Sequence, residues 1–204
     1  CKNEEKYIGN LLNSINKQSF KDYEIIISDF NSTDNTINII NNYKKVLPIK
    51  IVNGGLPSVA RNNGFKHSNT DYLLFIDSDI YFKDIKLIEK SINFMINKDL
   101  YLVTCYLNSD KIKTKLIYFL SNIASFLSKF DKPFATTQFF LIKKDIFNKL
   151  NGFNEEVKHC EDYLLSKNIK RSKFGIVNSF CYSDDRRFKK SGYWPYPFGT
   201  AVGC

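Results

Sequence analysis

The chain has 204 residues, of which 43% are hydrophobic and 25% charged, and this composition is typical of one globular domain and excludes a wholly disordered chain. Its formal net charge of +9 suits nucleic acid, an anionic membrane or a phosphorylated ligand, but a Lys- and Asn-rich composition alone gives the same charge. The five cysteines include no pair with zinc-type spacing, and their odd number indicates a reducing cytoplasm.

The periodicity of apolar residues predicts helices that alternate with strands along the chain. Strands are expected at residues 23–28, 48–52, 72–76, 100–107 and 139–142. Helices are expected at residues 3–15, 57–66, 85–96, 111–130 and 144–150. Two more are expected, one after the turn at 31–34 that includes residues 37–43, and one that begins near residue 161. This alternation predicts an α/β fold with a mostly parallel central sheet and helices on both faces.

Acidic residues follow two of the predicted strands. Asp29 ends one strand, and Asp77, Ser78 and Asp79 follow another. Ligands of such sheets bind beyond the carboxyl ends of the strands, so these side chains are expected on one rim. Two carboxylates two residues apart can hold one Mg²⁺ or Mn²⁺, and such an ion offsets charge on a departing diphosphate. Burying both carboxylates without a function would be costly, which favours the metal-site interpretation.

Other candidates each have a structural alternative. Asp29 can accept a hydrogen bond from a base or ribose, or cap a helix. Arg61 can pair with a phosphate, or with a carboxylate of the rim. Glu161 and Asp162 stand at a predicted helix start, where a carboxylate can take a proton from an acceptor hydroxyl or interact with the helix dipole. The residues alone favour the dipole role for this pair.

Six short motifs resemble, in family order, those of the family-2 glycosyltransferases, which have the Rossmann-like GT-A fold. They lie at residues 3–5 (similar to the end of "YNEE"), 28–36 ("VDDGSTDNT"), 60–64 ("ARNxG"), 75–79 ("FLDSD"), 151–155 ("GGFDE") and 161–165 ("EDYEL"). Residues 183–190 also resemble a less specific "SDRRFKK" stretch. Phe30 stands where the family has a second Asp. The chain looks like a fragment without the family's first strand and its C-terminal end.

The resemblance implies a metal-assisted, inverting transfer of a sugar from a nucleotide sugar, with a UDP-sugar favoured over GDP-mannose. It implies donor-binding roles for Glu4, Asp29, Arg61, Asp77, Ser78 and Asp79, and metal ligation by Asp79 and Asp77. It implies that Asp162 is the general base and that Glu161 helps to position the acceptor. The cofactor would be Mn²⁺ or Mg²⁺, and the acceptor a glycan or a lipid-linked molecule rather than nucleic acid.

The domain organisation follows from the same motifs. Residues 1–185 are expected to form one domain, with a donor-binding half at 1–107 and an acceptor-binding half at 108–185, and 186–204 a truncated basic and aromatic tail. Residues 111–132 carry a wide apolar band flanked by lysines. Two interpretations apply to this stretch: a peripheral contact with the inner face of an anionic membrane, or a helix packed on the sheet beside the acceptor site. The second is favoured.

Three other functions compete with this interpretation. A nucleotidyltransferase can share the sheet and the acidic pair, but no basic Gly-rich phosphate loop is present in the sequence. A basic nucleic-acid-binding module would carry aromatic side chains on its surface, whereas most aromatics here fall in core-like runs. The third alternative is a catalytically inactive glycosyltransferase-like fragment. The presence of Asp77, Asp79 and Asp162 argues against it, whereas the apparent lack of the family's first strand argues for it.

Overall fold

The computed structural model describes residues 1–157 and 159–184. The predicted tail at 186–204 lies outside the described residues, as does most of the motif at 183–190. Within the described part, seven α-helices and seven strands alternate along the chain. The predicted α/β class is confirmed, and the expected helices and strands are all present.

The helices are α1 (Ile8–Asn16), α2 (Thr36–Tyr43), α3 (Pro57–Lys66), α4 (Leu87–Asn97), α5 (Ile112–Ser128), α6 (Lys144–Lys149) and α7 (Glu161–Ser166), with a short 3₁₀ helix at Arg171–Lys173. The strands are β1 (Ile25–Asp29), β2 (Ile49–Asn53), β3 (Tyr72–Phe75), β4 (Ile80–Phe82), β5 (Leu102–Asn108), β6 (Phe140–Lys143) and β7 (Phe174–Ser183). The two strands that the sequence pattern did not predict are β4 and β7.

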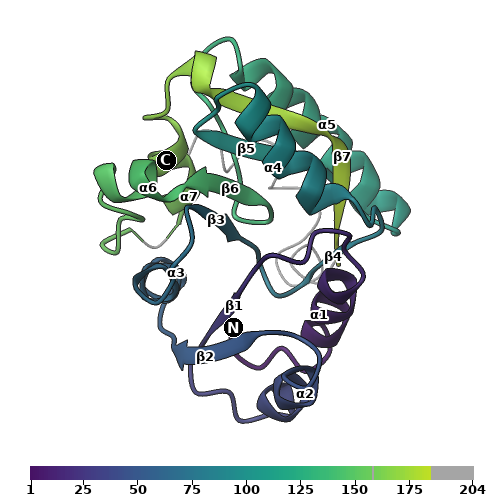
Figure 1. Ribbon diagram of the computed structural model, residues 1–204. Coiled ribbons are helices and arrows are strands. Elements are labelled where there is room, and N and C mark those ends of the chain that lie inside the picture. Colours follow the sequence, from purple (N-terminus) through teal and green to yellow (C-terminus); the bar gives the residue numbers. More distant parts are fainter. Residues whose placement is uncertain (158, 185–204) are drawn as a thin grey trace.

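The strands form two sheets (Figure 1). The larger has the order β3-β6-β5-β7-β4, and the smaller is the parallel pair β1-β2. The pairings in the larger sheet are mixed rather than mostly parallel, because β6 runs antiparallel to both of its neighbours and β4 antiparallel to β7. Only β5 and β7 pair in parallel there among the described strands.

Two apolar cores hold the helices and the two sheets together. One packs α1, α2 and α4 against the sheets, and its fully buried members include Leu12, Ile40, Leu87 and Met95. The other is rich in aromatic rings, which lie under the turn that follows α6. The ring of Phe75 lies 5.0 Å from the rings of both Phe147 and Phe153, which fixes the end of β3 against that turn.

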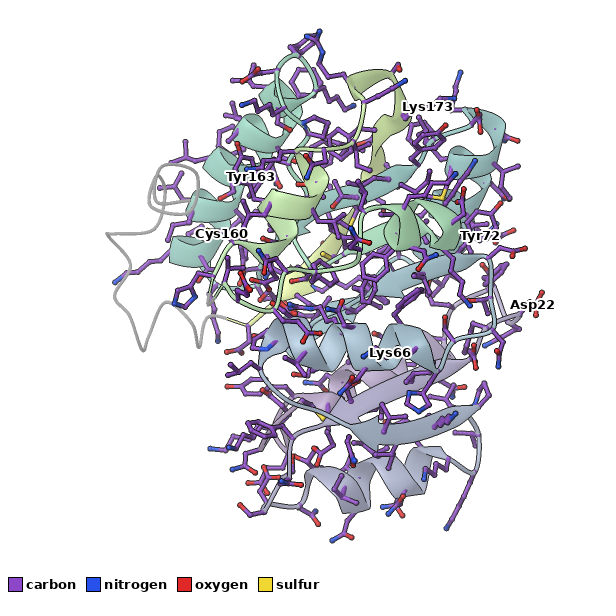
Figure 2. All side chains as sticks on the ribbon, turned by 90° about the vertical axis from the view of Figure 1, so that its left-hand side faces the viewer. Asp22, Lys66, Tyr72, Cys160, Tyr163 and Lys173 are labelled. Carbon is purple, nitrogen blue, oxygen red and sulfur yellow. The ribbon has the colours of Figure 1, made fainter. Side chains whose placement is uncertain are left out.

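Helix α3 connects the smaller sheet to the part of the chain that carries α6. It contacts β1 and β2 on one side, and the Phe65 ring near its end lies 4.9 Å from Phe147 of α6 on the other. Figure 2 looks onto α3, near whose end Lys66 is labelled, with the small sheet below it and the part that carries Tyr163 above. Helix α3 therefore lies between the smaller sheet and the part of the chain that carries α6.

A gap separates β1 from β3. Neither strand pairs with the other in the described part of the chain, and each pairs on one side only. Side chains and backbone of both strands line one cavity of about 1720 Å³. The same cavity extends to the acidic residues that follow β3.

Candidate active site

The cavity brings most of the predicted site residues together. Its wall includes the side of the small sheet, the turn after β3, α3, α5 and the start of α7. The predicted site residues on this wall are Glu4, Arg61, Asp77, Ser78, Asp79, Glu161 and Asp162. Asp29 lies directly beside the wall, between Ser28 and Phe30, which both line it. The shared rim expected from the strand ends is therefore present.

Asp29 fastens the loop that follows β1. Its two carboxylate oxygens accept hydrogen bonds from the Ser32 hydroxyl at 2.5 Å and the Ser32 backbone N–H at 3.0 Å. This is an Asx-type turn within the loop and not the helix cap expected as one role of Asp29, because α2 begins only at Thr36. Next to it Gly54 donates its N–H to the Asp29 carbonyl at 2.7 Å, and a Cβ on Gly54 would lie 2.6 Å from the Asp29 carbonyl carbon. Only glycine fits this approach.

Glu4 lies at the opposite side of the same loop. Its side chain belongs to the buried part of the wall, with 8% of the residue exposed. The Glu4 backbone N–H donates to the Thr36 hydroxyl at 2.7 Å, which ties the start of the chain to α2. The loop between β1 and α2 and the residues before α1 therefore hold each other beside the cavity.

Arg61 joins three separate segments. One guanidinium nitrogen donates to Asp77 Oδ1 at 2.8 Å and to Thr137 Oγ1 at 2.7 Å, and the other donates to Glu161 Oε1 at 2.5 Å. Burial by itself lowers the pKa of Arg61, but the charges of Asp77 and Glu161 outweigh it and raise the pKa above its ordinary value. Of the two partners expected for Arg61, a phosphate or a carboxylate of the rim, the structure shows the carboxylate.

The turn after β3 presents Asp77 and Asp79 at the cavity. Asp79 is only 6% exposed. Within the described ranges no three His, Cys, Asp or Glu side chains gather closely enough to hold an ion alone. Mg²⁺ and Mn²⁺ sites often use one or two carboxylates and take the remaining oxygens from substrate phosphates and water. The two carboxylates fit such a site, and Arg61 pairs with Asp77 at its edge.

Asp162 lines the same cavity from the first turn of α7. Its Oδ2 accepts the Thr137 N–H at 3.2 Å, and its Oδ1 accepts the Tyr163 N–H at 2.8 Å. Burial, reinforced by the charge of Glu161, raises the pKa of Asp162 to about 6. A carboxylate with that pKa is ionised at neutral pH yet basic enough to accept a proton.

Thr137 is a site residue that the sequence pattern did not reveal. Its hydroxyl accepts a hydrogen bond from Arg61 and its N–H donates to Asp162, so Thr137 links the guanidinium to the Asp162 carboxylate. The only signal was a run of polar residues, 136–138, just before β6. Such a run is ordinary for a loop, and its role becomes visible only from the fold.

The turn at residues 151–155 is fastened to α3. The Asn62 amide donates to the Phe153 carbonyl and to Glu155 Oε1, both at 2.8 Å, and its oxygen accepts the Phe153 N–H at 3.0 Å. Gly152 has a φ of +69°, and a Cβ there would lie 2.7 Å from Asn62 Oδ1. The turn therefore needs glycine, and it anchors α3 at Asn62, the residue next to Arg61.

Helix α5 forms the remaining wall through its polar side. Tyr118, Ser121, Asn122 and Ser125 line the cavity. The Asn122 side chain exchanges two hydrogen bonds of 2.9 Å with the backbone of Leu107 in β5. Helix α5 therefore lies beside the sheet and the cavity, as the favoured interpretation predicted. Its apolar band, however, faces outward rather than toward the protein. No helix in the described part of the chain combines the length and apolar character that crossing a bilayer requires.

Comparison with known proteins identifies relatives of the chain. The family model "Glycosyl transferase family 2" matches residues 1–151. Poly(ribitol-phosphate) beta-N-acetylglucosaminyltransferase TarS of Staphylococcus aureus is 40% identical over 85 residues, which are 39% of this chain and 15% of TarS. Glycosyltransferase GlyG of Streptococcus pneumoniae is 28% identical over 211 residues, covering 91% of this chain and 68% of GlyG.

Solved structures share the fold. Mannosyltransferase PcManGT from Pyrobaculum calidifontis has a TM-score of 0.75 at 16% identity, covering 100% of this chain and 62% of that protein. Residues 1–349 of S. aureus TarS give a TM-score of 0.70 at 24% identity, covering 89% of this chain and 56% of that structure. The chain spans less than two thirds of both solved structures and a small part of full-length TarS. With a family match over residues 1–151 and this fold, the chain belongs to glycosyl transferase family 2 and has the GT-A fold.

Proposed function

We propose that the chain is the catalytic part of a glycosyltransferase that moves a sugar from a nucleotide-sugar donor to a hydroxyl group, with inversion at the sugar carbon. The observation that carries the proposal is that two acidic groups from distant segments, the Asp77–Asp79 turn and Asp162, line one cavity. A UDP-sugar is the favoured donor and GDP-mannose the second. In support, the TarS structure holds UDP-GlcNAc and the PcManGT structure holds GDP-Man and Mn²⁺.

The donor would bind in the half formed by residues 1–107. Glu4 and Asp29 would contact the base and ribose, Ser78 and Asp77 the donor, and Arg61 the nucleotide. Asp79 would be the main ligand of Mn²⁺ or Mg²⁺, with Asp77 as the second. When bound, the ion supplies charge stabilisation for the departing nucleoside diphosphate. The Asp77–Arg61 contact of 2.8 Å would hold the turn in place for that binding.

The acceptor would bind in the half formed by residues 108–185. Asp162 takes the proton of the acceptor hydroxyl, whose oxygen forms a bond to the anomeric carbon as the bond from that carbon to the diphosphate breaks. One in-line displacement of this kind inverts the configuration. Glu161, held by Arg61 at 2.5 Å, would position the acceptor. We propose a glycan or lipid-linked hydroxyl as the acceptor.

A thermal-shift screen of nucleotide sugars with and without Mn²⁺ tests the donor site. A UDP compound is expected to raise the unfolding temperature only when the metal is present, because Asp79 would hold the ion and the ion would offset the charge of the diphosphate. Asp79→Ala should abolish this shift, whereas Asp145→Ala, which removes an exposed carboxylate on α6, should preserve it. A shift that survives Asp79→Ala overturns the metal assignment.

Product analysis separates the proposed reaction from nucleotide transfer. Release of a nucleoside diphosphate together with a glycosylated acceptor supports the transferase. Release of pyrophosphate would instead identify a nucleotidyltransferase that uses the same sheet and the same acidic turn. The anomeric configuration of the product, read by NMR coupling constants, tests the inversion.

A further inference from the structure

Helix α5 is amphipathic, but its polar side faces the protein. Thr114 and Tyr118 are buried, and Ser121, Asn122 and Ser125 line the cavity. Hydrogen bonds hold this side down: besides the Asn122 pair, the Gln138 side chain donates to the Tyr118 hydroxyl at 3.3 Å. A surface helix normally buries its apolar stripe and exposes its polar one. The orientation of α5 is the reverse.

The outer side of α5 is a large apolar patch. Eight large apolar residues, spaced so that they share one face of the helix and the turn after it, are between 43% and 80% exposed. This α5 patch consists of Ile112, Leu116, Phe119, Leu120, Ile123, Phe126, Leu127 and Phe130. It contains more than half of the exposed large apolar residues in the described part of the chain. A contiguous apolar patch of this size marks a surface that binds something.

Positive charges surround the α5 patch. Five lysines flank it, and no Asp or Glu occurs between residues 111 and 130; the lysines are Lys111, Lys113, Lys115, Lys129 and Lys132. One carboxylate stands at each end of this stretch, Asp110 before it and Asp131 after it. Asp110 accepts hydrogen bonds from Lys83 at 2.5 Å and from the Tyr81 hydroxyl at 2.6 Å. Arg171 adds a further cation, because its guanidinium donates to the Phe130 carbonyl at 2.7 Å.

We propose that the α5 patch docks flat on the anionic surface of a lipid bilayer. Exposed Leu, Ile and Phe side chains enter the boundary between head groups and acyl chains, and the flanking lysines contact the anionic head groups. A second copy of the chain is a poorer partner, since two such faces would bring their lysine rims together. Docking would lay the cavity wall formed by α5 along the membrane. The proposal rests on α5 alone and does not depend on the proposed sugar transfer.

Vesicle co-sedimentation tests the proposal. The chain is expected to bind vesicles of phosphatidylcholine with phosphatidylglycerol, to bind pure phosphatidylcholine much more weakly, and to lose affinity as salt rises. The double substitution Leu116→Ser/Phe119→Ser should lower binding at least about tenfold, because it removes two side chains that enter the apolar layer. Lys111→Gln/Lys115→Gln should lower it about fivefold per lysine at low salt.

The matched control is Val46→Ser/Ile96→Ser, which removes two apolar side chains that are 62% and 51% exposed but lie away from α5. This variant should bind vesicles as the unchanged chain does, and all variants should keep the same unfolding midpoint because the replaced side chains are exposed. Absence of binding to anionic vesicles overturns the proposal. So does a reduction by the control as large as that caused by the α5 substitutions.

Sedimentation equilibrium supplies a second readout. A monomer in solution that binds anionic vesicles supports the proposal. A dimer that Leu116→Ser/Phe119→Ser converts to a monomer, without vesicle binding by the unchanged chain, would show that a second copy covers the α5 patch and would overturn it. Vesicle binding that falls with the lysine substitutions but is unaffected by Leu116→Ser/Phe119→Ser also overturns it, because charge alone would then explain binding.

Discussion

The two acidic groups that line the cavity, at the end of β3 and at the start of α7, contain the same kind of side chain in different electrostatic surroundings. At the end of β3, Asp77 lies 2.8 Å from the Arg61 guanidinium. At the start of α7, Asp162 is buried beside Glu161, and its pKa is raised to about 6. Arg61 contacts Glu161 as well, so its charge is shared by both groups. Asp77 is paired with a cation, whereas burial raises the pKa of Asp162.

This difference matches the two tasks that sugar transfer requires. The leaving group needs fixed negative ligands that hold a cation, and the acceptor needs a group that accepts a proton near neutral pH. Neither requirement could be assigned from residue type, because both groups contain Asp with a neighbouring acid or hydroxyl. Their surroundings in the fold distinguish them.

The largest expected effect comes from removing the proton acceptor. Asp162→Asn should lower kcat about a thousandfold, because a positioned general base typically contributes between 10² and 10⁴ in rate. The metal-dependent thermal shift with a UDP compound should be retained, since the donor site is untouched. In the unchanged protein kcat/KM should rise with pH through about 6, as Asp162 ionises. Activity within tenfold of the unchanged protein would exclude Asp162 as the base.

Arg61→Met should cost about 3 kcal/mol of the free energy of unfolding. The substitution leaves Asp77 and Glu161 partly buried without their cation, and breaking such a pair is much more costly than replacing both partners. Denaturant unfolding at neutral pH measures the effect. A companion Arg61→Met/Asp77→Asn/Glu161→Gln variant should recover much of the loss. If it recovers nothing, the packing of Arg61 rather than its charge is responsible.

Asp162→Asn should also change how stability depends on pH. Folding raises the Asp162 pKa from 3.8 to about 6, so the folded state holds the proton more tightly and loses stability as pH rises between these values, by up to about 3 kcal/mol. The substitution removes that loss. The change that Asp162→Asn causes in the free energy of unfolding should therefore be about 2 kcal/mol more favourable above pH 7 than at pH 4. Equal effects at both pH values would contradict the raised pKa.

The smallest effect is expected at a surface ion pair. Lys149→Met breaks the contact of 3.3 Å with Asp145 on α6, where the two side chains are 71% and 60% exposed. Exposed pairs of this kind contribute little, so the change in unfolding free energy should stay below about 0.5 kcal/mol. The same denaturant series that includes Arg61→Met gives the comparison. A loss similar to that of Arg61→Met would show that burial does not set the difference between these pairs.

Much of the fold was predictable because its central strands are continuous apolar runs. Strands β1, β2, β3, β5 and β6 begin and end within about two residues of their predicted limits. The two missed strands lack that signal. β4 has three residues and follows the Asp77–Asp79 turn directly, and β7 mixes buried and exposed positions after the last recognised motif. The mixed strand directions follow from tertiary packing, which the alternation of elements does not specify.

The site was predictable as a set of residues but not as a set of contacts. Strand ends indicated a common rim, yet the Arg61–Glu161 contact joins residues 100 positions apart, and no spacing rule predicts it. For α5, the apolar band predicted the helix and its apolar face. It did not predict whether that face would point into the protein or outward. Its outward orientation depends on the hydrogen bonds that Asn122 and Tyr118 make on the other side.

The open edges of β1 and β3 have a consequence for how the protein behaves at high concentration. Apart from the hydrogen bonds of Cys1 with Ser28 and Phe30 at the end of β1, no neighbouring strand of the described chain pairs with these edges. Such edges can template pairing with a strand of another molecule. Self-association seeded there would grow with concentration and involve main-chain hydrogen bonds. It would persist in Leu116→Ser/Phe119→Ser, and amide hydrogen exchange would show it as new protection within residues 25–29 and 72–75.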